Sequence, residues 1–223
     1  MIGVFSDSHG DLAAFDAAFE QLKARGARRF IFAGGDYQDL DDWFYFRRDR
    51  VRASRDYTDE DFLQDVRTWL AHGEQVERPP AFWGHAEVQR ALEDELVKVR
   101  DRFIRVCEKD TKLGADAPGL RKSMDMIADT LCCIVHDKND LEKDDLINAT
   151  VIIHGKEPEG KVVQIGPRYF VTPGRLSGGG TPSCALIEKV EKNLQVTILG
   201  LEGQTLVEPQ VLSVDRRNKI SVK

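Results

Sequence analysis

The spacing of hydrophobic and polar residues over the first 40 positions predicts a strand, a helix and a second strand. Segments 2–5 and 29–33 are short apolar runs without polar alternation, which is typical of strands buried on both faces. Between them, apolar residues recur at helical spacing over 12–25, and Asp11 stands where a helix cap is expected. Two strands joined by a helix predict a right-handed parallel unit.

From about residue 41 to 129 the chain is rich in charge and in helical spacing, and poor in β-branched runs. This pattern predicts a helical insertion with helices over 59–71 and 85–112. The apolar stripe from Leu92 to Val106 steps by four and three, as expected of a helix that packs along another helix. That partner helix belongs either to the same chain or to a second copy.

Strand patterns return at 130–135 and 150–153, with a short helix near 141–147 between them. The remaining sequence predicts five antiparallel strands separated by turns, over 161–165, 169–172, 184–190, 194–201 and 205–214. We therefore predict one α/β domain over residues 1–223, interrupted by the helical insertion at about 41–129.

Composition and charge exclude several classes of protein. Of the 223 residues, 41% are hydrophobic and 31% charged, which fits neither a disordered chain nor a membrane protein. No run approaches the roughly 18–20 apolar residues of a membrane helix. The N-terminus lacks a signal-peptide pattern, so we predict a cytoplasmic protein. The net charge of −6 argues against broad nucleic-acid binding.

The four cysteines form no CxxC pair. They favour buried thiols in a reducing compartment over a disulfide framework or a zinc site. These cysteines are Cys107, Cys132, Cys133 and Cys184.

Candidate chemistry begins where the first two predicted strands end. The run Asp7-Ser8-His9-Gly10 follows the first strand, and Gly35-Asp36 follows the second. Ligands of α/β sheets bind at the carboxyl ends of strands, so Asp7, His9 and Asp36 converge if the two strands are neighbours. Carboxylate and imidazole ligands together suit Mn, Fe or Zn better than Ca. The alternative interpretation is a helix-capping Asp with two polar loop residues.

These residues make the sequence similar to the calcineurin-like metallophosphoesterase superfamily, in particular its small bacterial phosphodiesterase branch. Family members carry, in order, D-x-H, GD, GNH[DE], a lone His and GHxH. Residues 7–9 and 35–36 match the first two motifs, and His136 resembles the lone His. Residues 172–175 and 181–188 resemble the family's closing NPGS segment and its following strand.

The resemblance covers about residues 1–40 and 130–215 and implies both a fold and a set of metal ligands. The implied fold is a four-layer α/β structure, a β-sandwich flanked by helices, with the helical insertion lying outside the resemblance. Asp7 and His9 would bind a first metal ion, Asp36 would bridge two ions, and His136 would bind the second.

The sequence departs from this family at two motifs. No Asn occurs between Met1 and Lys138, so GNH[DE] is absent; the nearest fragment, Gly84-His85-Ala86-Glu87, is better explained as a helix start. Lys156 and Pro158 occupy the two His positions of GHxH. His154 comes one residue early, which favours a strand-end histidine over a rescued ligand. Four of the family's seven ligands therefore remain, and two-metal hydrolysis needs both ions.

Two cations stand at altered motif positions. Lys156 occupies a second-metal ligand position, and Arg175 replaces the Ser of NPGS. Either side chain can bind an anion or offset the carboxylates in place of a metal ion, whereas a turn lysine can also point to solvent. The glycine run 177–180 can present backbone N–H groups to an anion or serve as a flexible hairpin connection.

Within the insertion, the aromatic run 43–46 precedes five arginines between residues 47 and 55. Aromatics beside arginines can bind nucleic acid. Six acidic residues surround them, so a helix with an aromatic core face and paired surface charges is the better explanation.

We therefore predict a metallophosphoesterase-fold protein with a degenerate metal site, a poor or inactive phosphoesterase that acts by binding a ligand or a protein partner. It binds one divalent metal ion (Mn, Fe or Zn) or none, and the helical insertion is the candidate surface for a partner or for self-association. The alternative is an active phosphomonoesterase or phosphodiesterase with a mononuclear metal site.

Overall fold

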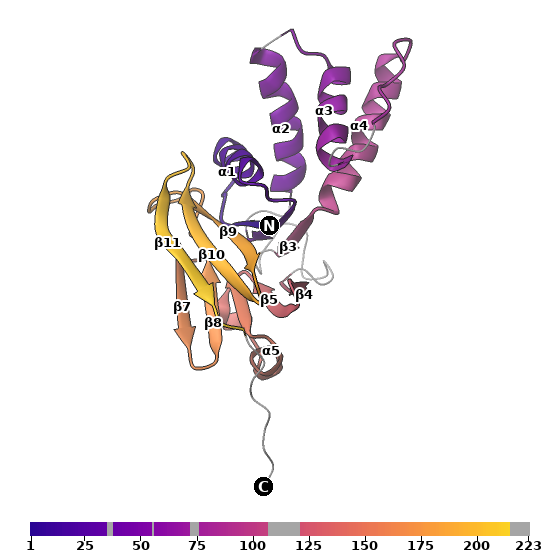
Figure 1. Cartoon of the computed structure of the whole chain (residues 1–223). Helices are drawn as coiled ribbons and strands as arrows, with labels where there is room; N and C mark the ends of the chain where they lie inside the picture. Colours follow the sequence, from indigo (N-terminus) through magenta and orange to yellow (C-terminus); the bar gives the residue numbers. More distant parts are fainter. Residues whose placement is uncertain (35–37, 55, 72–75, 107–120, 215–223) are drawn as a thin grey trace. The chain divides into compact units, whose positions relative to one another are not determined.

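The computed structural model describes residues 1–34, 38–54, 56–71, 76–106 and 121–214. The chain divides into two compact units, whose residues can be found in Figure 1 from the residue numbers on the colour bar. We call Met1–Tyr37 with Ile104–Lys223 the sandwich unit, and Gln38–Phe103 the helical unit.

The first sheet of the sandwich unit has six strands in the order β11-β10-β9-β1-β2-β3. Its central pair, β1 and β2, is parallel, as the sequence predicts for two strands joined by a helix, and β1 pairs antiparallel with β9. The strands are β1 (Ile2–Phe5), β2 (Arg29–Ala33), β3 (Phe103–Val106), β9 (Ser183–Val190), β10 (Asn193–Gly200) and β11 (Thr205–Leu212).

The second sheet has five strands in the order β4-β5-β6-β8-β7. β5, β6 and β8 run parallel, with β4 and β7 antiparallel at the two edges. The predicted antiparallel arrangement therefore holds for the β7–β8 pair but is wrong for β8 against β6. The strands are β4 (Lys122–Ile127), β5 (Thr130–Val135), β6 (Val151–His154), β7 (Lys161–Ile165) and β8 (Arg168–Thr172).

Helices cover the outer faces of the two sheets. On the first sheet, α1 (Leu12–Ala24) packs Phe15 and Phe19 against Phe5 and Phe30 of the strands, and Asp11 caps the helix. On the second, the single-turn η1 (Lys138–Asp140) and α5 (Lys143–Asn148) follow β5, and a small apolar cluster lies beneath α5.

Between the two sheets lies the main hydrophobic core. It joins Val4 and Ile31 of the first sheet to Ile134 and Ile153 of the second, all fully buried. Each such side chain contributes about 1.5–3 kcal/mol of transfer free energy when it leaves water. The result is the four-layer α/β sandwich that the sequence predicts.

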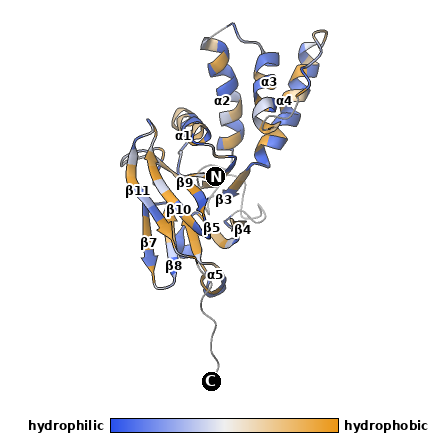
Figure 2. Ribbon diagram, viewed as in Figure 1, coloured by the Kyte–Doolittle hydropathy of each residue, from blue (hydrophilic) through white to orange (hydrophobic). Residues whose placement is uncertain are grey.

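The helical unit contains α2 (Asp39–Ser54), α3 (Asp59–Ala71) and α4 (His85–Arg100). Figure 2 shows hydrophobic and hydrophilic residues side by side on each helix, as expected of amphipathic helices. On α4, Leu92, Leu96 and Val99 are buried, and α3 and α2 contact this helix. This part of the predicted stripe is therefore covered within the chain.

Two predicted boundaries of the helical segment are wrong. α4 ends at Arg100 rather than near residue 112, because β3 begins at Phe103 and joins the first sheet; residues 107–112 lie outside the described residues. The segment predicted as helical up to about residue 129 contains β4, which pairs with β5. Ala128 and Asp129 connect β4 to β5 with positive φ angles of 45° and 69°.

Charged and aromatic residues of α2 follow the predicted arrangement. Trp43 and Phe44 are buried, while Arg48 pairs with Asp49 and Arg52 pairs with Asp59. Arg55 lies outside the described residues.

Cys132, Cys133 and Cys184 are free and buried, as predicted, and burial raises the pKa values of their thiols to about 12, 11 and 12. Cys107 lies outside the described residues. Among the helices that the structure describes, none is both long and apolar enough to cross a membrane.

Candidate functional site

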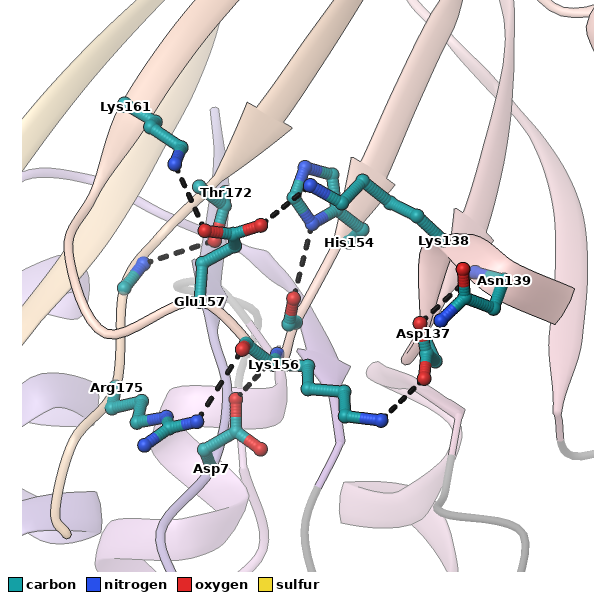
Figure 3. A network of polar contacts seen from close by, with 12 residues as sticks. Asp7, Asp137, Lys138, Asn139, His154, Lys156, Glu157, Lys161, Thr172 and Arg175 are labelled. Atoms are coloured by element: carbon teal, nitrogen blue, oxygen red, sulfur yellow. Dashed lines mark hydrogen bonds and ion pairs between the residues drawn. The ribbon is translucent and has the colours of Figure 1, made fainter. Parts of the chain in front are cut away.

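The candidate site lies where loops following parallel strands of both sheets come together. The loop after β1 carries Asp7, the loop after β5 carries His136, and the loop after β6 carries Lys156. Figure 3 shows Asp7 beside the loop of Lys156 and Glu157, with Arg175 close by. This edge is where an α/β sheet is expected to place its ligands.

The carboxylate of Asp7 is surrounded by protein hydrogen-bond donors. Its Oδ1 lies 2.8 Å from Nε2 of His136, and its Oδ2 accepts a hydrogen bond of 2.8 Å from the backbone N–H of Lys156. The Ser6 hydroxyl lies 3.0 Å from Oδ2 and 2.8 Å from the carbonyl oxygen of Gly174, so its single proton serves one of the two acceptors. Asp7 is 1% exposed and His136 is 3% exposed.

The pKa of Asp7 reflects two opposing effects. Burial by itself raises the pKa, because a charged carboxylate is poorly solvated in the interior. The hydrogen bond and charge of His136, together with the donors of Lys156 and Ser6, outweigh burial and lower the pKa below its usual value. Asp7 is therefore an ionised group whose charge is compensated inside the protein.

Three non-glycine residues at this edge adopt left-handed backbone conformations. The φ angles of Asp7, His9 and Lys156 are 51°, 47° and 63°. Each costs about 1–2 kcal/mol relative to a right-handed conformation. Backbone hydrogen bonds hold Asp7 in place: its N–H donates to Gly34, and its carbonyl accepts from Ser177. Strained backbone of this kind is concentrated at functional sites.

Two glycines allow the backbone to approach the His136 ring. A Cβ atom at Gly34 would lie 1.8 Å from Cδ2 of His136. A Cβ atom at Gly155 would lie 2.1 Å from the carbonyl oxygen of Ala33 and 3.0 Å from the same ring carbon. Only glycine therefore fits at either position without movement of the backbone or the ring.

The side chain of Lys156 reaches a partner that the sequence did not single out. Its ammonium pairs with Asp137, directly after His136, and Nη2 of Arg175 lies 3.4 Å from the Lys156 carbonyl oxygen. Since Asp36 lies outside the described residues, the predicted charge compensation between Lys156 and Asp36 stays a prediction.

Next along the chain, Glu157 lies between two lysines. Its carboxylate accepts from Lys138 and, at 2.8 Å, from Lys161. These hydrogen bonds, which Figure 3 draws as dashed lines, lower the pKa of Glu157 to about 2.

We expect Glu157 to make stability depend on pH under acidic conditions. Because its pKa is depressed in the folded state, its contribution is fully present above about pH 4.5, the unfolded value, and is lost as pH falls toward 2. Urea unfolding at several pH values should show a steeper acid loss for wild type than for Glu157→Gln. Equal slopes for the two proteins would contradict this assignment.

The remaining predicted histidines lie in different environments. His9 is exposed, and its ring lies against Gly178, where a Cβ atom would be 2.8 Å from Cδ2 of the ring. His154 ends β6 and is 2% exposed, with Nδ1 3.0 Å from the Gly155 carbonyl oxygen. Burial lowers the pKa of His154 and favours its neutral form. His154 is therefore a buried histidine at the end of a strand, as the sequence favours.

His85 is the first residue of α4, in the helical unit. Gly84 precedes it as N-cap, and the Gly84 N–H donates to Glu87 at 2.6 Å. These contacts agree with the helix-start interpretation of this fragment.

The described donors do not form a metal-ligand set. Within residues 1–34, 38–54, 56–71, 76–106 and 121–214, no three His, Cys, Asp or Glu side chains are grouped to hold a metal ion. Asp7 and His136 bind each other directly, and His9 is exposed. With Asp36 outside the described residues, the metal-ligand roles of these four residues stay predictions.

Sequence reasoning missed four contributors to the site: Ser6, Gly34, Asp137 and Gly155. The signal for Asp137 is its position directly after the candidate ligand His136 in the sequence. Gly155 was visible only as a motif glycine, and nothing in the sequence signals that Ser6 or Gly34 would contact this site.

No protein-family model matches the sequence, and no curated protein sequence matches it either. Solved structures do match. YfcE, a phosphoesterase from E. coli, matches with a TM-score of 0.51 and 15% sequence identity. The match covers 95% of this chain and 98% of the YfcE chain. The chain has the calcineurin-like metallophosphoesterase fold.

Two further structures have the same TM-score of 0.51. A Streptococcus pneumoniae protein described as a predicted phosphoesterase is 13% identical, with coverage of 94% of this chain and 95% of its own. Vacuolar protein sorting 29 from Cryptosporidium parvum is 10% identical, with coverage of 94% and 96%. The likeness concerns the fold, which the resemblance at residues 7–9 and 35–36 had predicted.

Proposed function

We propose that this chain is a metallophosphoesterase-fold protein with a degenerate metal site, a poor or inactive phosphoesterase that acts by binding. The observation that carries this proposal is the set of contacts around Asp7. Both of its carboxylate oxygens are engaged, by His136 on one side and by Lys156 and Ser6 on the other. These donors occupy two or three of the roughly four lone-pair sites of the carboxylate, which leaves Asp7 fewer sites for a metal ion.

The sequence supports the same conclusion. The family's GNH[DE] motif, which supplies an Asn ligand and the leaving-group His, is absent, because no Asn precedes Lys138. Lys156 and Pro158 stand where the family has two histidines. Hydrolysis by two metal ions requires both ions to activate water and stabilise the phosphoryl oxygens. We further propose that the helical unit is an insertion in a single phosphoesterase-like domain.

Metal content and turnover test this proposal together. Purified protein is analysed for bound Mn, Fe and Zn, then assayed with p-nitrophenyl phosphate and bis-p-nitrophenyl phosphate in added Mn²⁺. We expect no turnover that depends on Asp36, so wild type and Asp36→Asn should give equal rates. Turnover that Asp36→Asn abolishes would overturn the binding-protein proposal.

The alternative function is a phosphoesterase with a mononuclear metal site. It is favoured by the retention of all four candidate ligands in the sequence, Asp7, His9, Asp36 and His136. One tightly bound equivalent of Mn, Fe or Zn together with Asp36-dependent turnover would support it. Absence of both from the purified protein would exclude it.

A further inference from the structure

The helical unit contains a pocket unrelated to the candidate site described above. It has a volume of about 680 Å³ and is lined by residues of α3, of α4 and of the segments 76–83 and 101–102. Pockets that bind small molecules commonly measure about 300–1,000 Å³. The described residues that line it all belong to the helical unit.

Four cations and three carboxylates line the pocket, namely Arg67, Arg78, Lys98 and Arg102 with Glu77, Glu95 and Asp101. Glu95 of α4 has only 3% of its side chain exposed, and its Oε1 accepts from Nε of Arg67 at 3.0 Å and from Nζ of Lys98 at 2.9 Å. Two cations therefore share a single buried carboxylate. Arg78 adds a further, exposed cation, and the lining side chains together carry a net charge of +1.

The lining of the pocket also has an apolar part. Leu70, Val76, Pro80 and Trp83 line it, and the N–H of Trp83 donates to the Pro80 carbonyl at 3.0 Å, which fixes the turn that carries the indole. An indole face supplies a flat, polarisable surface for another ring, and an arginine can stack on such a ring as well.

We propose that this pocket binds a small aromatic anion. Its ring would lie against Leu70 and Trp83, and its negative group would lie toward Arg67, Arg78 and Lys98. A neutral ring would use the apolar residues alone, and a small anion without a ring would use the cations alone. A ligand that combines the two groups uses both kinds of lining residue.

Three probes separate the two contributions. Calorimetric titration compares 2-naphthoate with 2-naphthamide, which has the same ring without the charge, and with acetate, which has the charge without the ring. We expect 2-naphthoate to bind about tenfold more tightly than 2-naphthamide, since one hydrogen bond to a charged group corresponds to about that factor. Acetate should give no heat at millimolar concentration.

Variants at the mouth of the pocket assign the binding to it. Arg78→Ala should weaken 2-naphthoate about fivefold and leave 2-naphthamide unchanged, whereas Trp83→Leu should weaken both. Neither substitution removes a partner of the buried Glu95 carboxylate, which pairs with Arg67 and Lys98, so both variants should fold. Arg90→Ala, an exposed arginine of α4 that does not line the pocket, is the matched control.

Equal affinities for 2-naphthoate and 2-naphthamide would overturn the proposal. It would also be overturned if Arg90→Ala weakened the binding of 2-naphthoate as much as Arg78→Ala does. The test does not depend on the phosphoesterase question, because none of these substitutions lies in the sandwich unit.

Discussion

Gly155→Ala is expected to lower the free energy of unfolding by about 3 kcal/mol or more. The new Cβ atom would lie 2.1 Å from the carbonyl oxygen of Ala33, which belongs to the other sheet. A backbone oxygen cannot rotate away as a side chain does. The two sheets would have to separate locally at the edge where Asp7 and His136 meet.

The control for this prediction is Gly166→Ala. Gly166 has a φ of 58° and open space around its Cβ position, so the substitution should cost about 1 kcal/mol from backbone conformation alone. Urea unfolding of both variants measures the difference. If Gly155→Ala costs no more than Gly166→Ala, the close approach of the two sheets at Ala33 is incorrect.

The second large effect concerns the Asp7–His136 pair. Asp7→Asn and His136→Ala are each expected to lower the free energy of unfolding by about 3–5 kcal/mol, because each substitution leaves a buried side chain without its hydrogen-bond partner. The loss of unfolding free energy in the double variant should be about 2 kcal/mol smaller than the sum of the two single losses, because the Asp7–His136 interaction can be lost only once. Urea unfolding of all four proteins in EDTA gives this coupling energy.

The metal dependence of the coupling tests how the pair is held. With direct hydrogen bonding, the coupling should be the same in EDTA and in Mn²⁺. Coupling that appears only with Mn²⁺ would show that a metal ion joins the two side chains and would contradict the proposed function. The exposed pair Lys189–Asp129, at 2.9 Å, is the matched control and should couple by less than about 1 kcal/mol.

Elements with a strong local pattern could be predicted from the sequence. β1, α1 and β2 combine buried runs, helical spacing and a capping Asp11, and their positions agree with the prediction to within about a residue. The convergence of Asp7 and His136 does not follow from local information, because they come after strands of different sheets, and only the family resemblance placed His136 at the same site.

β4 could not be predicted in the same way. Tight two-residue hairpins usually carry Asn-Gly or Asp-Gly at their centre, because both residues need positive φ. Here Ala128 and Asp129 occupy those positions, with φ of 45° and 69°, so the usual turn signal is missing. Pairing with β5 supplies the stability that local sequence does not, and it converts an expected helical segment into a strand.

The partners at the site escaped prediction for a different reason. Lys156 was considered for its ammonium group, yet the group that reaches Asp7 is its backbone N–H. Which backbone atom faces a carboxylate depends on loop geometry, here a φ of 63°. Residue type carries little information about that angle outside glycine, Asn and Asp.

This backbone contact separates the two groups that residue 156 brings to the site. Substitution of Lys156 by any residue other than proline removes its ammonium group but leaves the peptide N–H of residue 156 on Asp7. Proline alone among the amino acids lacks that N–H, and its φ of about −65° is incompatible with the 63° found here. Substitution of Lys156 therefore tests the role of its ammonium group alone, and only a change in the loop backbone would remove the hydrogen bond to Asp7.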